Sequence, residues 1–363
     1  MRSSFSSLIA SLAAVSSVTA AGGPGDQQTV IDAITALNTF YNSTSGLWGN
    51  STTPWWHSGV SLRVLAEYML ITGSTDYVDQ ATFVVDNNRA PLNWWPEGDG
   101  DFRADSTDDT GWWALALVSL YQVTGNETYL DIAKEDETYM FSYWNTTTCN
   151  GGLIWDIPEL SYHNAISNEL YLELTATMHN VIPGDTYYLG QAMEEWNWFN
   201  ASGMIGSDYL INDGLTEDSA CTNNGQTVWT YNQGVILSGL VELASATGDA
   251  TYLDTAQNIA DAVVNSASLS PNGILTEAGC PTEADCEPNG TSFKGTFIRG
   301  LAKLNAALGD GSYTSYITNN AQSVYDNAIQ SSTNYYGFTW QGPFDGQETG
   351  KQASAINLLM STL

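Results

Sequence analysis

Positive charge is scarce in this chain. Its 363 residues include nine Lys and Arg against forty Asp and Glu, which gives a net charge of −31. A field of this sign repels the phosphates of nucleic acids and the anionic surfaces of membranes, so we expect neither as a partner. It suits a secreted protein that works in acidic surroundings, where part of the negative charge is neutralised.

Cysteine and histidine are scarce as well. The chain has three His, four Cys and no Cys-x-x-Cys pair, so we expect no metal site and no cofactor. Four Cys suit two disulfides in a secreted protein, and three pairings are possible. A bond between Cys280 and Cys286 would close a small loop and leave Cys149 to pair with Cys221.

Long apolar runs are absent after the first residues. A basic tip at Arg2, a short apolar run at 8–15 and small residues up to Ala20 predict a secretory signal peptide over residues 1–20. No later run is long enough to cross a bilayer, so stable membrane insertion is not expected. The mature chain, 21–363, is predicted to be one secreted, extracellular domain, and cell-wall association is compatible with it. Six glycosylation sequons support secretion: Asn42, Asn50, Asn126, Asn145, Asn200 and Asn289.

Strand-like alternation is nearly absent, and a helical repeat is present instead. Similar turns recur at Gly73, Gly125 and Gly248, with looser copies at Gly184 and Gly309. Each Gly follows an apolar segment and precedes a more polar one, as in two antiparallel helices joined by a Gly-capped turn. Six such hairpins predict an all-α fold, an (α/α)6 toroid. We expect the protein to be a monomer. An open superhelix is the alternative.

Twelve helices are expected, apolar inner ones alternating with amphipathic outer ones. The inner helices are predicted near 56–72, 108–124, 162–180, 230–247, 291–308 and 347–361, and the outer ones near 27–42, 75–87, 127–144, 185–200, 250–267 and 312–330. The connections from outer to inner helices are long and should emerge on one face of the toroid. Eight of the thirteen Trp lie in or at the end of these loops, where indoles can stack on sugar rings: Trp48, Trp55, Trp56, Trp94, Trp95, Trp155, Trp229 and Trp340.

One inner helix begins with two adjacent carboxylates. Asp108 and Asp109 fall in the first turn, where the helix dipole favours negative charge, and Ser106 or Thr107 can cap the helix. Their carboxyl groups could lie roughly 5–6 Å apart, close to the separation in retaining glycosidases. An isolated Asp-Asp pair is more often a helix-stabilising feature, but the Trp-rich loops favour a catalytic interpretation.

Further motifs follow the Asp pair along the chain. The set comprises Asp108-Asp109 with Trp112-Trp113, and residues 151–155, 164–168, 213–214, 229–234 and 293–299. Together these motifs resemble glycoside hydrolase family 76, the endo-α-1,6-mannanases, which also includes fungal wall transglycosidases. The resemblance spans nearly the whole mature chain and implies a retaining endo-α-1,6-mannanase acting on α-1,6-mannan or mannooligosaccharides. It implies that Asp108 is the nucleophile and Asp109 the general acid/base.

The resemblance and the loop face also provide candidate sugar-binding residues. Asp213 is expected to bind a mannose hydroxyl and Trp155 to stack on a sugar, whereas Asn232 and Gln233 either bind sugar or cap their helix. The candidate substrate-binding residues are Trp95, Asp105, Trp112, Trp155, Asn168, Asp213, Tyr231, Asn232, Gln233 and Trp340.

Two other functions stay open. A transglycosidase would transfer mannose to another sugar, on mannan or on a GPI-core glycan. A non-catalytic mannan-binding protein would bind mannan at the Trp-rich loop face without cleaving it. The segment 350–363 is expected to form the twelfth helix with no apolar tail, which favours a freely secreted hydrolase over an anchored transglycosidase. Two of the few cations, Lys294 and Arg299, are expected to be structural partners of acids on the inner helices.

Overall fold

The structure is a computed structural model that describes residues 22–50, 52–280 and 283–363. The predicted signal peptide lies outside these residues. The regular elements of the described residues are helices, apart from two short hairpins, β1 (Tyr41–Asn42) with β2 (Leu47–Trp48) and β3 (Ile329–Gln330) with β4 (Tyr335–Tyr336). Within it, none of the helices has the length and apolar character needed to cross a membrane.

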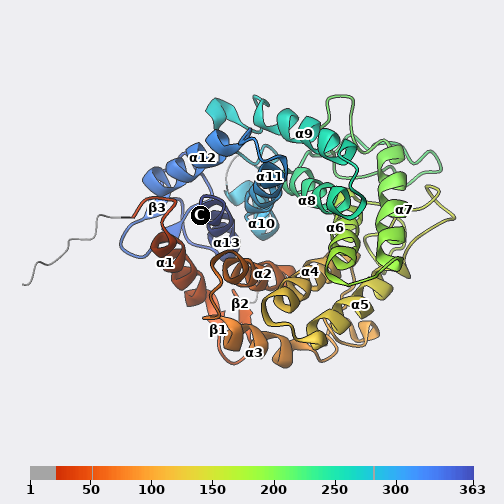
Figure 1. The fold of residues 1–363 in the computed structure, drawn as a ribbon, viewed down its shortest axis with the longest axis horizontal. Coiled ribbons are helices and arrows are strands. Elements are labelled where there is room, and N and C mark those ends of the chain that lie inside the picture. The colour runs from red at the N-terminus through yellow and green to blue at the C-terminus, as the bar shows by residue number, and fades with distance from the viewer. Residues whose placement is uncertain (1–21, 51, 281–282) are drawn as a thin grey trace, which may run out of the picture.

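Six helices form a closed inner ring. Each packs against the next, and the last packs against the first, so the open superhelix is excluded (Figure 1). An outer helix accompanies each of them, and the fold is the predicted (α/α)6 toroid. The inner helices are α2 (Trp55–Thr72), α4 (Thr107–Thr124), α6 (Ala165–Val181), α8 (Thr230–Thr247), α11 (Phe293–Leu308) and α13 (Thr349–Met360); the outer helices are α1 (Gln27–Leu37), α3 (Val78–Asn88), α5 (Glu127–Phe141), α7 (Tyr187–Ser202), α9 (Thr251–Val264) and α12 (Thr314–Asn327).

Residue patterns explain the two rings. Every residue of α4 from Thr110 to Leu120 is buried, as expected for a helix packed on all sides. In α9 only four residues are buried, at helical spacing: Ala256, Ile259, Ala260 and Val263. The repeated turn glycines work as predicted: Gly125 follows α4 with φ of 67°, and its N–H donates to the Tyr121 carbonyl at 2.8 Å.

The structure differs from the predicted elements in detail. The first helix ends at Leu37, and a 3-10 turn, η1 (Asn38–Phe40), and β1 replace its expected last residues. A short helix, α10 (Glu283–Gly290), lies in the long connection before α11, where a loop was predicted. With eight residues and Pro288 inside, α10 is too short to produce a recognisable helical period. Two further 3-10 turns, η2 (Pro96–Gly98) and η3 (Pro271–Gly273), lie in long connections.

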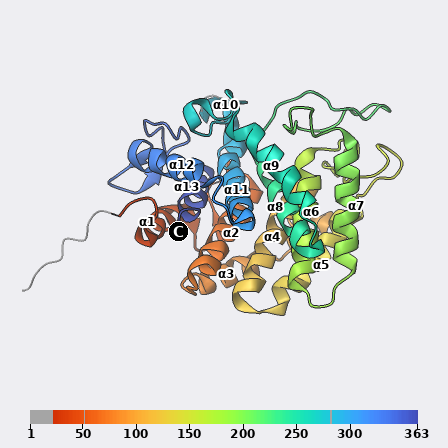
Figure 2. The same cartoon turned by 45° about the horizontal axis from the view of Figure 1, so that its top comes forward.

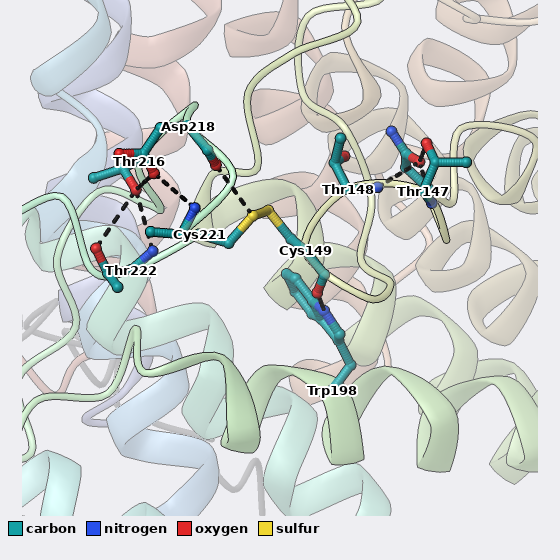
Figure 3. The surroundings of a disulfide bond; sticks show 10 residues. Thr147, Thr148, Cys149, Trp198, Thr216, Asp218, Cys221 and Thr222 are labelled. Atoms are coloured by element: carbon teal, nitrogen blue, oxygen red, sulfur yellow. Dashed lines mark hydrogen bonds between the residues drawn. A yellow bond between two sulfur atoms is a disulfide. The ribbon is translucent and has the colours of Figure 1, made fainter.

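Two disulfides stabilise the loop face. Cys149 is bonded to Cys221, which joins the loop before α6 to the loop before α8 (Figure 3). Cys280 is bonded to Cys286 at the start of α10. The α7 residue Trp198 donates from Nε1 to the Cys149 carbonyl at 2.9 Å, so the first disulfide is also fixed to the outer ring. This is the pairing in which Cys280–Cys286 closes the small loop.

The long-range disulfide should contribute the larger share of stability. Because Cys149 and Cys221 are 72 residues apart, replacing both with Ser is expected to lower the free energy of unfolding by about 2–4 kcal/mol. Urea unfolding of the purified variant measures this loss. The matched control, Cys280→Ser with Cys286→Ser, opens a loop of separation 6 and should cost less; an equal or larger loss in the control would contradict the prediction.

Candidate active site

The N-terminal ends of five inner helices, α2, α4, α6, α8 and α11, line a cavity of about 620 Å³. The long loops that precede these helices, together with α10, complete its wall; α10 and the loop between α7 and α8 lie at one end of the ring in Figure 2. Both aspartates of the predicted pair line this cavity. The other lining residues include Trp55, Trp56, Trp112, Trp155, Tyr162, Asn164, Asp213, Trp229, Tyr231, Asn289 and Phe293.

Hydrogen bonds to neighbouring segments hold the start of α4 in place, whereas no side-chain capping hydrogen bond does. Ser106 is the N-cap residue, as one of the two predicted alternatives, but its side chain makes no capping hydrogen bond. The Thr107 hydroxyl points inward and is hydrogen-bonded to the Ile154 carbonyl, which accepts, and to the Ser167 hydroxyl, both at 2.9 Å. These bonds tie the first turn of α4 to the loop before α6, and therefore fix the position of the next two residues.

Asp108 is held in place by N–H donors. Its Oδ1 accepts a hydrogen bond from the Asp109 N–H at 2.9 Å and from Trp155 Nε1 at 2.9 Å. Burial raises the pKa of Asp108 to about 6, while hydrogen bonds from Ser106, Asp109 and Trp155 act in the opposite direction. Above that pH, Asp108 is an oriented carboxylate inside an aromatic cavity.

Asp109 has a different environment. Burial, and then the charges of Asp108 and Asp105, raise its pKa well above the ordinary value. Because a neighbouring anion favours the protonated form of Asp109, this group keeps its proton while Asp108 is ionised. Such a division between two adjacent acids is what a nucleophile and a general acid require.

Aromatic rings from four inner helices form the floor of the cavity. The Trp112 ring stacks on Trp56 with centroids 5.1 Å apart, and on Tyr231 at 6.5 Å. Tyr231 in turn stacks on Phe293 at 3.8 Å. Aromatic faces of this kind suit the flat C–H surfaces of a pyranose.

A second polar group lies across the cavity. The Tyr162 hydroxyl donates to Asp213 Oδ2, and Asn224 Nδ2 donates to the Tyr162 oxygen at 2.8 Å. Burial raises the pKa of Asp213, whereas hydrogen bonds from Tyr162 and Trp229 lower it. Asn164 caps α6 by accepting from the Ser167 N–H at 3.1 Å, which leaves its amide group at the cavity wall.

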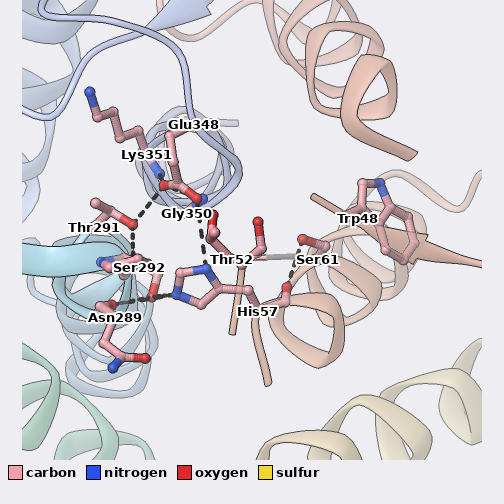
Figure 4. A network of polar contacts seen from close by, with 12 residues as sticks. Trp48, Thr52, His57, Ser61, Asn289, Thr291, Ser292, Glu348, Gly350 and Lys351 are labelled. Atoms are coloured by element: carbon pink, nitrogen blue, oxygen red, sulfur yellow. Dashed lines mark hydrogen bonds and ion pairs between the residues drawn. The ribbon is translucent and has the colours of Figure 1, made fainter. Parts of the chain in front are cut away.

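Behind this wall, His57 connects the first and last inner helices (Figure 4). Its Nε2 lies 3.3 Å from Ser292 Oγ, and its Nδ1 lies 3.8 Å from Glu348 Oε1. Glu348 caps α13 and accepts a hydrogen bond from the Thr291 hydroxyl at 2.7 Å. Burial lowers the pKa of His57, and the charge of Glu348 opposes that shift. The network supports Asn289, whose Oδ1 accepts from Trp56 Nε1 at 3.0 Å.

Four of the ten candidate sugar-binding residues line the cavity beside the Asp pair: Trp112, Trp155, Asp213 and Tyr231. Six lie outside the lining: Trp95, Asp105, Asn168, Asn232, Gln233 and Trp340.

Two of these six hold loops in place. Asn168 bonds to both the N–H and the carbonyl of Leu153, and Gln233 does the same with Ile211. Asn232 is fully buried, with its Nδ2 3.5 Å from the Asn212 carbonyl. For these three amides the predicted sugar contact is replaced by contacts within the protein.

The remaining three candidates outside the cavity lining each lie in a different environment. Trp95 donates from Nε1 to the Tyr139 hydroxyl at 2.9 Å. Trp340 is fully buried with Lys294 Nζ 4.5 Å from its ring centroid. Asp105 is half-buried and acts on the cavity only through its charge, which raises the pKa of Asp109.

Several lining residues were not among the candidates. Trp56 and Phe293 stand in the first turns of inner helices, so a search of every inner-helix start would have found them. Tyr162 and Asn289 carry no local signal, because their roles depend on partners far away in the chain. Among the described residues, no group of three or more His, Cys, Asp or Glu is arranged to hold a metal ion.

Comparison with known proteins identifies fungal relatives of this chain. A putative mannan endo-1,6-alpha-mannosidase of Schizosaccharomyces pombe is 28% identical over 72% of this chain and 60% of its own length, so the chain spans about 60% of that relative. Mannan endo-1,6-alpha-mannosidase DCW1 of Candida albicans is 24% identical over 85% of this chain and 72% of its own.

Solved structures show the same fold. The GH76A alpha-1,6-mannanase from Salegentibacter sp. HEL1_6 superposes with a TM-score of 0.82 at 21% identity, covering 93% of this chain and 98% of its own. Dfg5 from Chaetomium thermophilum superposes with a TM-score of 0.79 at 19% identity, covering 93% and 90%. The model of the family described as glycosyl hydrolase family 76 matches residues 27–363. The chain therefore belongs to glycosyl hydrolase family 76.

Proposed function

We propose that this protein is a secreted, retaining endo-α-1,6-mannanase that hydrolyses α-1,6-linked mannose chains of fungal cell-wall mannan. The observation that carries the proposal is the Asp108–Asp109 pair at the start of α4, inside a cavity floored by aromatic rings. Fungal relatives are named mannan endo-1,6-alpha-mannosidase. In a similar solved mannanase, a variant with two consecutive aspartates replaced is inactive and was captured with alpha-1,6-mannotetrose.

The proposed reaction has two steps. Asp108 attacks the anomeric carbon of the mannose at the cleavage point, while Asp109 donates its proton to the leaving glycosidic oxygen. The resulting mannosyl-enzyme ester is cleaved by a water molecule whose proton passes to Asp109. Trp155 and the Asp109 N–H, which both donate to Asp108 Oδ1, orient the attacking carboxylate.

The other lining residues bind the sugar chain. The partly exposed rings of Trp155 and Tyr231 receive the apolar faces of mannose units, and Asp213 and Asn164 hydrogen-bond hydroxyl groups. The mature protein is proposed to be a monomeric glycoprotein, a single domain over 21–363 that begins after cleavage behind Ala20.

Digestion of three glycans tests the function: linear α-1,6-mannan, branched yeast mannan and a GPI-core glycan. The expected result is a rapid fall in the length of linear mannan with release of reducing ends. Lengthened or grafted products without new reducing ends would establish a transglycosidase instead. Binding of mannooligosaccharides without any turnover would establish a non-catalytic binding protein.

The anomeric configuration of the first product tests the roles proposed for Asp108 and Asp109. Adjacent carboxylates leave little room for the water that an inverting enzyme places between groups roughly 6.5–9.5 Å apart. We therefore expect the α-anomer as the first product, detected by proton NMR on a fresh digest before mutarotation. Early β-anomer would mean that Asp108 is not the nucleophile and that another acid, such as Asp213, activates water.

The fall in kcat/KM at acidic pH should reflect the protonation of Asp108. Its pKa is raised to about 6, and it must be ionised to attack, so kcat/KM should fall about tenfold per unit as the pH drops below that value. Trp155→Phe removes a hydrogen bond that lowers this pKa, so the midpoint should move to higher pH. A midpoint that stays in place in the Trp155→Phe enzyme would contradict the assignment.

A further inference from the structure

A second cavity lies at the opposite end of the inner ring. It measures about 470 Å³ and is lined by residues from the middle to the C-terminal end of the inner helices, all six of which contribute. The two cavities have no lining residue in common, and on α4 the residues of this cavity begin at Leu115, one turn beyond Trp112 of the other. The upper walls are aliphatic, and no aromatic ring lines this cavity within the part of the chain that the structure describes. The aliphatic residues are Leu70, Ile71, Leu115, Ala302, Ala306 and Met360.

The charged lining residues form what we call the floor of this cavity, and they belong to a charge-balanced network that also includes the buried Glu173, which is not itself a lining residue. Arg63 donates from Nε to Glu67 Oε1 at 2.7 Å and from Nη2 to Glu173 Oε1 at 2.6 Å. Lys303 Nζ lies 2.6 Å from Glu242 Oε1. The three cations Arg63, Arg299 and Lys303 thus face three anions, Glu67, Glu173 and Glu242. Burial opposes the ionised form of Glu173, but these cations keep its pKa low, at about 2.

Several buried polar atoms around this floor have no hydrogen-bond partner among the described residues, although the Arg299 guanidinium forms longer ion pairs. Arg63 Nη1 and Arg299 Nη2 lack an acceptor at hydrogen-bonding distance, although both side chains are about nine-tenths buried or more. Three more buried atoms lack a hydrogen-bond partner: the hydroxyl oxygens of Thr177 and Ser238, and Oδ1 of Asn357. Since buried polar groups are nearly always hydrogen-bonded, this set indicates an occupant that both donates and accepts.

We propose that this cavity binds a small neutral amphiphile, an aliphatic chain that ends in hydroxyl groups. A hydroxyl can accept from Arg63 Nη1 or Ser238 and donate to Asn357 Oδ1, and the aliphatic chain fills the space beside Leu115 and Met360. An ion of either sign would lose its hydration without finding an uncompensated charge, because the charges on the floor already cancel.

A matched series of eight-carbon compounds tests the proposal: 1,2-octanediol, octanoate and octylammonium, titrated into the full-length protein by calorimetry. We expect saturable binding of the diol, with either ion at least tenfold weaker. Binding of an ion as tightly as the diol would overturn the neutral head group. Absence of saturation by all three compounds would overturn the site.

Variants locate the bound diol. Ala302→Leu narrows the cavity from α11 and should weaken diol binding at least tenfold, while mannan hydrolysis stays unchanged. The control Ala307→Leu lies on the same helix, is exposed and does not line this cavity, so it should bind like the unmodified protein. Ser238→Ala removes one unpartnered hydroxyl with little change in packing and should weaken binding about two- to tenfold. Unchanged affinity in both Ala302→Leu and Ser238→Ala would place the diol elsewhere and refute the proposal.

Discussion

Replacement of Asp108 by Asn is expected to lower kcat on linear α-1,6-mannan by more than ~10⁴-fold, because the variant lacks the proposed nucleophile. The Asn oxygen can still accept from the Asp109 N–H and from Trp155 Nε1, so the cavity should keep its shape. Steady-state release of reducing ends measures the loss, and an unchanged thermal transition shows that the fold is intact. Ordinary turnover by the Asp108→Asn enzyme would exclude the proposed nucleophile.

Replacement of Asp109 by Asn should lower kcat on mannan by ~10²–10⁴-fold, the usual contribution of a general acid. The loss should be smaller for the first step with a nitrophenyl α-1,6-mannobioside, whose leaving group needs no proton. The mannosyl-enzyme should then accumulate, and azide, which needs no general base, should restore turnover. An Asp109→Asn enzyme that is equally impaired on both substrates and insensitive to azide would contradict the assignment.

Asp105 offers a matched control for both variants. It is an aspartate three residues before the pair, half-buried and outside the cavity lining. Asp105→Asn removes a charge that raises the pKa of Asp109, so the alkaline side of the pH profile should move to lower pH. Its kcat at the optimum should change less than about tenfold, because the group takes part in neither proposed step.

The toroid could be predicted from the sequence because its repeat depends on local residue types, chiefly the glycines of the turns. A Gly in the left-handed conformation ends α2, α4, α8 and α11 at Gly73, Gly125, Gly248 and Gly309. The looser copy at Gly184 does not cap its helix, since α6 ends with Ile182 in an extended conformation. The prediction was accurate where a single residue type decides the backbone conformation.

The site was predicted less completely, because a sequence shows which end of a helix a residue occupies but not how the side chain is rotated. Asn232 and Gln233 stand at the start of α8 as expected, yet both are buried and turned toward the loop at 211–212. Trp340 lies in a long connection as expected, yet its ring packs over Lys294 in the core. Contacts such as Tyr162 with Asp213 depend on the tertiary fold and have no local signature.

Charged residues illustrate the same limit. Arg299 interacts with acids of the inner helices as predicted, at 3.7 Å from Glu173. Its companion Lys294 donates to the Phe338 carbonyl and packs on two aromatic rings. Burial lowers the pKa of Lys294 to about 7, and the charge of Glu277 opposes this shift. The scarcity of cations predicted that both would be structural, but it could not indicate the carbonyl and aromatic partners of Lys294.

Closure of the ring has a consequence for synthesis of the protein. The last inner helix packs against both α1 and α2, and Gln352 in α13 donates to the Ala33 carbonyl in α1 at 2.9 Å. Until the segment 349–360 has been translated, α2 lacks one neighbour and its apolar surface stays exposed. Contacts between such distant segments form slowly, so assembly of the toroid should follow translation of the chain. A nascent chain therefore carries both proposed catalytic aspartates long before it carries a complete cavity, and activity should arise only when the last helix has docked.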